Sequence, residues 1–109
     1  MFIPAENVRF KVYLSLGSNI DPIYNIPKAI NYLKTLVSIN VISNFWETAP
    51  VGNDGKCFIN AALLIYTNYS LDYFKQKIIR KIEADLGRIR TENKYDPRPI
   101  DIDIIIVNN

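Results

Sequence analysis

The sequence predicts an α+β fold in which two helices cover one face of a four-stranded antiparallel sheet. Four segments have the composition and period of strands, and two segments carry the apolar stripe of a helix. These elements follow one another in the order βαββαβ, which is the order of the ferredoxin-like split fold. The 109 residues suit one domain with one core, so we expect a single domain over residues 1–109.

The first half of the chain contains two predicted strands and the first helix. Apolar and polar residues alternate from residue 10 to residue 16, and Gly17 is expected to end that strand. Asn25 is the predicted cap of the helix, with Pro27 in the first turn, where proline is tolerated. The second strand is predicted over residues 39–46. The apolar stripe of the helix consists of Ile26, Ile30, Leu33 and Leu36.

The second half of the chain contains two further strands around a second helix. These strands are predicted over residues 57–66 and 100–107. Ser70 is the predicted cap of the helix between them, and Gly87 is expected just past its end, where glycine is favoured. The polar loop over residues 88–99 is long for a compact domain, and such loops are often functional. The apolar stripe of this helix consists of Leu71, Phe74, Ile78, Ile82 and Leu86.

Successive side chains of a strand point to opposite faces, which sorts the residues of the third and fourth strands. The opposite face from the helices is predicted to hold Phe58, Asn60, Asp101 and Asp103. Because the first strand of this fold lies between the third and fourth, the amide and the carboxylates are expected about 10 Å apart. This arrangement predicts a site for a flat heterocycle beside a metal. The residues predicted to face the helices are Ile59, Ala61, Leu63, Ile65, Ile100, Ile102, Ile104 and Ile106.

Asp101 and Asp103 are the residues that most strongly suggest a metal. Their Cα atoms are expected about 6.6–7 Å apart on one strand face, so both carboxylates can reach the same hard cations. Mg²⁺ prefers one or two carboxylates together with phosphate oxygens, and Arg98 lies three residues before the pair, where it would suit phosphoryl transfer. An exposed Asp-x-Asp pair could instead serve only solubility or the protection of a sheet edge.

Basic residues concentrate in one part of the chain. Eight of the 13 Lys and Arg residues lie between Lys75 and Arg98, where only four acidic residues occur, although the net charge is only +2. Such a local field suits an anionic ligand such as a polyphosphate, with the loop over residues 88–99 closing over it. A solvated helix face followed by a flexible charged loop would have the same composition. The small net charge gives no support for a nucleic acid partner.

Composition excludes several other classes of site. The sequence has no histidine, which excludes His–Cys zinc sites and histidine-based catalytic triads. Cys57 is the only cysteine, so no disulfide forms within the chain, and this fits a reducing compartment. No apolar run reaches the length of a membrane span and the first residues lack a signal-peptide pattern, so we expect a soluble, cytoplasmic protein without membrane contacts.

Five motifs in consecutive order resemble those of the 6-hydroxymethyl-7,8-dihydropterin pyrophosphokinase family. They are LGSN at 16–19, TAPVG at 48–52, FINAA at 58–62, GRIR at 87–90 and DPRPIDID at 96–103. The resemblance extends from about Val12 to Val107, and the last motif is the most specific. It implies an ATP-dependent diphosphotransferase of folate biosynthesis, which transfers pyrophosphate to the hydroxymethyl group of 6-hydroxymethyl-7,8-dihydropterin and releases AMP in an Mg²⁺-dependent reaction.

The resemblance also implies roles for individual residues. Asp101 and Asp103 would bind two Mg²⁺ ions that bridge the ATP phosphates, and Arg88 and Arg98 would be catalytic. Arg80 occupies a position that in the family is often Gln and contacts nucleotide. Contacts with the dihydropterin are implied for Thr48, Val51, Phe58, Asn60 and Asp101. Contacts with the nucleotide are implied for Glu83, Arg90, Tyr95, Arg98 and Ile104.

The chain departs from the family mainly at its end. Family members usually continue for several tens of residues past the last strand, and that segment borders the open sheet face. Without this segment, part of the open face would expose an apolar patch. We expect the patch to be covered either by self-association or by a C-terminal segment that this sequence lacks. Two alternatives stay open, namely a degenerate homologue that binds pterin or nucleotide without efficient transfer and an interaction module that self-associates. The patch is predicted to consist of Ala62, Leu64, Tyr66, Ile105 and Val107.

Overall fold

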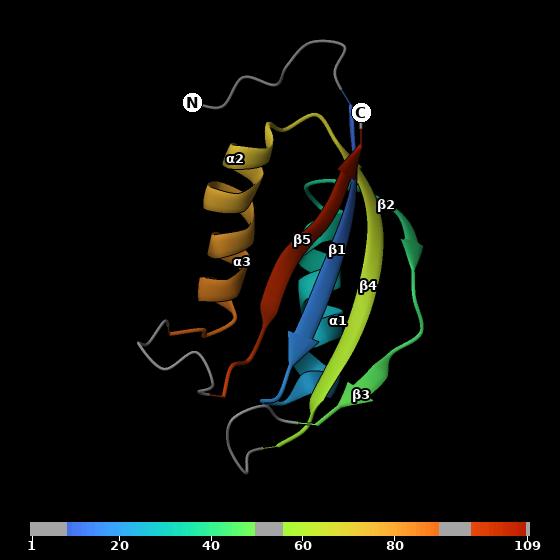
Figure 1. Cartoon of the computed structure of the whole chain (residues 1–109). Coiled ribbons are helices and arrows are strands. Elements are labelled where there is room, and N and C mark those ends of the chain that lie inside the picture. The colour runs from blue at the N-terminus through green and yellow to red at the C-terminus, as the bar shows by residue number, and fades with distance from the viewer. Residues whose placement is uncertain (1–8, 50–55, 90–96, 109) are drawn as a thin grey trace.

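A computed structural model describes residues 9–49, 56–89 and 97–108 of the chain (Figure 1). It has the mixed α+β composition that the sequence predicts. The strands are β1 (Phe10–Ser18), β2 (Ser38–Ile42), β3 (Trp46–Thr48), β4 (Phe58–Thr67) and β5 (Asp101–Asn108). The helical segments are α1 (Pro22–Lys34) and a second, continuous segment made of α2 (Leu71–Tyr73), the π-helical turn η1 (Phe74–Ile79) and α3 (Arg80–Asp85).

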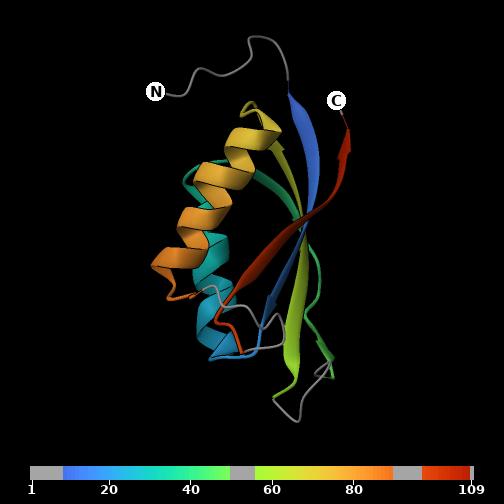
Figure 2. The same cartoon turned by 60° about the vertical axis from the view of Figure 1, so that its left-hand side comes forward.

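The described strands form one antiparallel sheet in the order β2-β4-β1-β5, and β3 also pairs with β4. β1 therefore lies between β4 and β5, as expected for the first strand. Both helical segments lie against the same face of the sheet (Figure 2). The core fills the space between the two layers. Its largest fully buried apolar side chains are Phe74, Leu14, Leu16, Ile26, Leu33, Leu63, Ile65, Ile82, Ile100 and Val12.

The prediction of one strand over residues 39–46 is wrong, because this segment forms the end of one strand and the start of another. At Ser43 the backbone N–H donates to the carbonyl of Ala62 (2.9 Å). The N–H of Ala62 in turn donates to the Ser43 hydroxyl (2.8 Å), which takes the place of a backbone carbonyl. This side chain interrupts the ladder between β2 and β3, so the sheet of the described residues has five strands and not four.

Helix α1 begins earlier than predicted, at Pro22 and not after Asn25. Proline at the first helical position loses no hydrogen bond, and its fixed φ suits the helix. Asn25 is buried in the first turn, where its side-chain N–H donates to the carbonyl of Ile20 (2.6 Å) and fixes the preceding loop. The strand before this loop continues through Gly17, which the sequence analysis expected to end it.

A β-bulge in β5 changes which side chains of its second half face the helices. The register with β1 shifts after Ile104, so Ile105 is the extra residue. The alternation therefore moves by one position, and Val107 packs against the core while Ile106 is 52% exposed. The predictions that Ile106 faces the helices and that Val107 lies on the open face are wrong for this reason.

The second helical segment begins and ends as predicted. The Ser70 hydroxyl accepts a hydrogen bond from the backbone N–H of Tyr73 (3.2 Å), and Gly87 follows the segment with a φ of 97°. The apolar stripe did not predict the π-helical turn inside it. None of the helices in the described ranges has both the length and the apolar character of a membrane span.

Candidate active site

One row of neighbouring residues crosses the open face of the sheet. Asn60 on β4 pairs with Gly17 on β1, and Gly17 pairs in turn with Asp101 on β5. Phe58 lies two residues before Asn60, and Asp103 lies two residues after Asp101, so each shares the strand face of its neighbour. The four side chains that the sequence predicted on one open face are therefore on the same face.

Gly17 keeps this row open between Asn60 and Asp101. A Cβ atom at this position would lie 3.1 Å from Asn60 Oδ1 and 3.6 Å from Phe58 Cδ1. A side chain there would thus crowd the Asn60 amide, make van der Waals contact with Phe58 and occupy the space above β1. The break in alternation after Leu16 predicts Gly17 only as the end of a strand and does not reveal this role. A glycine that continues an alternating strand is the signal that would have revealed a close approach.

Strand β3 holds the amide of Asn60 in one orientation. Its Nδ2 donates to Thr48 Oγ1 (3.0 Å) and to the backbone carbonyl of Trp46 (3.3 Å). With the nitrogen on the β3 side, Oδ1 is turned toward Gly17 and can accept a hydrogen bond from a ligand on the row. Thr48 therefore contributes its hydroxyl to the site.

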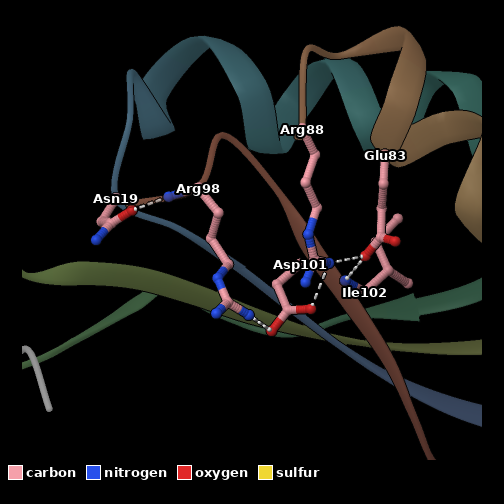
Figure 3. Close-up of polar contacts among 6 residues, drawn as sticks. All are labelled: Asn19, Glu83, Arg88, Arg98, Asp101 and Ile102. Carbon is pink, nitrogen blue, oxygen red and sulfur yellow. Dashed lines mark hydrogen bonds and ion pairs between the residues drawn. The ribbon is translucent and has the colours of Figure 1, made fainter. Parts of the chain in front are cut away.

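A charged cluster lies where the chain leaves α3 and enters β5 (Figure 3). Arg88 Nη1 donates to Asp101 Oδ1 (2.8 Å), and Arg98 Nη1 donates to Asp101 Oδ2 (3.4 Å). The two guanidinium groups thus contact different oxygens of one carboxylate. The side chains of Arg88 and Arg98 are only 10% and 19% exposed, so solvent screens their charges weakly.

Glu83 is a buried carboxylate that ties α3 to β5. It is 2% exposed, and its Oε2 accepts hydrogen bonds from Arg88 Nη1 (2.5 Å) and from the backbone N–H of Ile102 (2.9 Å). A buried carboxylate requires an opposite charge and hydrogen bonds, and these two residues supply both. Its predicted contact with a nucleotide stays a prediction. The observed contacts of Glu83 hold Arg88 against Asp101.

Asn19 fixes the chain just before β5. Its Oδ1 accepts a hydrogen bond from the backbone N–H of Arg98 (2.7 Å), and its own backbone N–H donates to the carbonyl of Arg98 (3.2 Å). Asn19 is buried, so both bonds are shielded from water. They fix the backbone from which Arg98 reaches Asp101. Asn19 belongs to the motif at 16–19, but nothing in that motif predicts this contact.

Asp103 is the second carboxylate on this face of β5. Desolvation, and then the charge of the neighbouring Asp101, raise the pKa of Asp103 above its usual value. A divalent cation would relieve the repulsion between these two carboxylates, and Mg²⁺ prefers such a small carboxylate set. Within the described ranges, no group of three or more His, Cys, Asp or Glu side chains could hold a metal. The other ligands of a cation here would have to be phosphate or water oxygens.

The charged cluster opens into a cavity of about 300 Å³ between the second helical segment and β5. Lys75 lines this cavity, although the sequence analysis did not name it as a site residue. A larger hollow of about 860 Å³ lies elsewhere, near Lys34 and Tyr66, and contains none of the predicted site residues. The residues around the smaller cavity are Lys75, Ile79, Arg80, Glu83, Arg88, Arg98, Asp101, Ile102 and Asp103.

Comparison with known protein families shows which family the chain belongs to. The sequence profile of the 7,8-dihydro-6-hydroxymethylpterin-pyrophosphokinase family matches residues 13–108. The chain belongs to this pyrophosphokinase family.

Individual relatives in the pyrophosphokinase family are longer than this chain. It is 40% identical over 98 residues to the 2-amino-4-hydroxy-6-hydroxymethyldihydropteridine pyrophosphokinase of Aquifex aeolicus (strain VF5), covering 87% of this chain and 59% of that protein. The protein of the same name from Bacillus subtilis (strain 168) is 35% identical over 101 residues, covering 88% and 59%. The folate synthesis bifunctional protein of Arabidopsis thaliana is 32% identical over 108 residues, covering 95% and 22%. The chain thus spans 59% or less of the length of each of these three relatives.

Several residues that the resemblance to the pyrophosphokinase family singled out remain to be placed. Val51, Arg90 and Tyr95 lie outside the described residues. Ile104 is partly buried and packs against the core. Its contact with a nucleotide stays a prediction.

Proposed function

We propose that the chain transfers pyrophosphate from ATP to the hydroxymethyl group of 6-hydroxymethyl-7,8-dihydropterin, as a step in folate biosynthesis. The hydroxymethyl oxygen would form a bond to the β-phosphorus and release its proton to solvent. The bond between the β-phosphorus and the oxygen that bridges it to the α-phosphorus would break, and AMP would leave with that oxygen. One observation carries the proposal: Arg88 and Arg98 both donate hydrogen bonds to the carboxylate of Asp101. Asp101 lies at one end of the row that begins at Asn60.

In this proposal the charged cluster binds and orients ATP. Phosphoryl-type transfer depends mainly on positioning and on cations near the phosphate oxygens. Arg88 and Arg98 are the cations that would contact these oxygens, and Glu83 keeps Arg88 in position. Asp101 and Asp103 would hold two Mg²⁺ ions, which when bound neutralise phosphate charge and align the attacking and leaving oxygens.

The uncharged part of the row would bind the dihydropterin. The ring of Phe58 offers a flat apolar surface for stacking, and Asn60 Oδ1 accepts a hydrogen bond from an N–H of the ligand. The missing side chain at Gly17 leaves room for the ring above β1. Since Asp101 ends the row, a ring bound in this way would direct its hydroxymethyl group toward the phosphates.

The proposal also includes a ferredoxin-like fold and a cytoplasmic location for the chain. The order β2-β4-β1-β5, with both helical segments on one face, supports a ferredoxin-like βαββαβ core to which β3 is an addition. Cys57 is a free, exposed thiol, which supports a reducing location such as the cytoplasm.

The test is conversion of ATP to AMP that depends on the dihydropterin. We expect Mg²⁺-dependent formation of one AMP and one pterin diphosphate per turnover, without ADP. Binding of both ligands without release of AMP would support the degenerate homologue instead. A concentration-dependent dimer that binds neither ligand would support the interaction module and overturn the proposal.

A further inference from the structure

The second helical segment departs from α-helical geometry beside the candidate site. Residues Phe74–Ile79 form a π-helical turn, in which the backbone N–H of Arg80 donates to the carbonyl of Lys75, five residues earlier. π-Helical turns are rare and occur frequently at functional sites. The turn lies directly before the helical residues that approach β5, so its effect falls on the wall of the cavity.

The π-helical turn brings Lys75 and Arg80 to the same side of the helix. In an α-helix with 3.6 residues per turn, side chains five positions apart would point roughly 140° away from each other. Here both side chains line the same cavity of about 300 Å³, with Ile79 between them. The wider turn thus presents two cations where an α-helix would present one.

These two cations differ from the arginines of the charged cluster. Arg88 and Arg98 are engaged by the carboxylates of Glu83 and Asp101. Lys75 and Arg80 make no hydrogen bond or ion pair with any residue that the structure describes. The cavity that these two cations line contains the carboxylates of Glu83 and Asp101, which are already paired with Arg88 and Arg98. Their charge is therefore available to an anion that enters the cavity.

We propose that Lys75, together with Arg80, forms a second cationic wall that binds phosphate oxygens of a nucleoside triphosphate. The inference rests on the proposed function, in which ATP occupies this cavity, and it adds Lys75 as a binding residue. A polyphosphate would then lie between two groups of cations, with Lys75 and Arg80 on the helix side and Arg88 and Arg98 on the strand side. Four cations match a ligand of several negative charges better than two do.

The test compares two lysines of the same helical turn. Lys75→Gln removes the charge that lines the cavity, and Lys77→Gln is the matched control, because Lys77 is exposed in the same turn and does not line the cavity. Both positions are exposed and glutamine is a good helix former, so both variants should fold. Affinity for ATP with Mg²⁺ is measured by calorimetry, without a pterin acceptor, and affinity for adenosine is measured in parallel.

We expect Lys75→Gln to weaken ATP binding by about three- to tenfold, an effect that shrinks at high salt, while adenosine binding does not change. Lys77→Gln should bind ATP like the wild type. Equal ATP affinities for the two variants, or an equal loss for adenosine and ATP in Lys75→Gln, would overturn the inference. If AMP release is intact in that case, only the role of Lys75 fails. A wild-type chain that does not bind ATP would overturn the proposed function and this inference together.

Discussion

The two ends of the candidate site are built in opposite ways. At the Asn60 end, the spacing of uncharged groups is set by the pairing of β4 with β1 and β3. At the Asp101 end, the geometry is set by ion pairs with Arg88 and Arg98, which lie outside the strands. Strand pairing thus sets the shape of the uncharged end, whereas ion pairs set the positions of the charged groups at the other end. We therefore expect substitutions at the charged end to reduce the rate strongly and substitutions at the uncharged end to reduce mainly the affinity for the pterin.

The largest effect is expected for Asp101→Ala. This change removes the carboxylate shared by the two arginines and the proposed metal ligand, so AMP release should fall by about 1000-fold or more. Turnover is measured at saturating ATP and pterin. Asp72→Ala is the control, because Asp72 is exposed on α2 and outside the cavity, and it should retain full activity. A variant at position 101 with activity within tenfold of the wild type would contradict the assignment.

Glu83→Ala should cause the largest loss of stability. It leaves Arg88 without one carboxylate and the backbone N–H of Ile102 without its acceptor, at a cost of about 3–5 kcal/mol in the free energy of unfolding. Urea unfolding followed by circular dichroism measures this loss. Glu83→Gln keeps an acceptor for Ile102 and should lose less. If both variants unfold at the same urea concentration as the wild type, the buried carboxylate does not hold this end together.

Gly17→Ala tests the uncharged end by steric exclusion. The backbone of Gly17 is not in the left-handed region, so alanine should be accommodated in β1 without loss of folding. The added Cβ would press on Asn60 Oδ1 and fill part of the space proposed for the ring, and we expect pterin affinity to fall about tenfold. ATP affinity of the same variant is the internal control and should not change. An unchanged pterin affinity would show that no ring lies above β1.

Thr48→Val tests the orientation of the Asn60 amide and should have a smaller effect. Valine keeps the shape of threonine but cannot accept the hydrogen bond from Asn60 Nδ2, so pterin affinity should fall by about threefold. Thr48→Ser restores the hydroxyl and should recover most of this loss. Thr35→Val, which removes an exposed hydroxyl at the end of α1 that bonds only to the carbonyl of Tyr32 among the described residues, is the control. If Thr48→Ser does not recover pterin affinity, the methyl group of Thr48, and not its hydroxyl, would be what supports binding.

The smallest effect is expected for the exposed charges of Asp85 and Lys81, which lie outside both ends of the site. Hydrogen bonds from Tyr32 and Lys81 hold the pKa of Asp85 below its usual value. Its contribution to stability is therefore present above the pKa of the unfolded chain and is lost as the pH falls through the folded pKa. Asp85→Asn should lower the thermal midpoint slightly near neutral pH and not at all in strong acid. A large loss at neutral pH would contradict the distinction between buried and exposed ion pairs.

The sequence predicted what depends on periodicity and local caps. Alternation in residues 57–66 and the cap at Ser70 have direct physical causes within a few residues, and both predictions are confirmed. The errors arose where a distant contact decides the structure. The hydroxyl of Ser43 interrupts a strand only because β4 lies beside it, and the bulge at Ile105 exists only in the register with β1.

The candidate site follows the same division. The shared face of Asn60 and Asp101 follows from strand period and strand order, so it could be predicted. The contacts of Asn19 with Arg98 and the place of Lys75 on the cavity wall could not. The first joins residues far apart in the sequence, and the second depends on a π-helical turn that an apolar stripe does not reveal.

The most direct test of the central claim is where a pterin binds. Backbone amide chemical shifts are followed by nuclear magnetic resonance while 6-hydroxymethylpterin is added to the chain. The largest changes are expected at Gly17, Asn60 and Asp101, which form one row across the sheet. Changes that instead gather around Lys34 and Tyr66, at the larger hollow, would contradict the assignment of the site to this row.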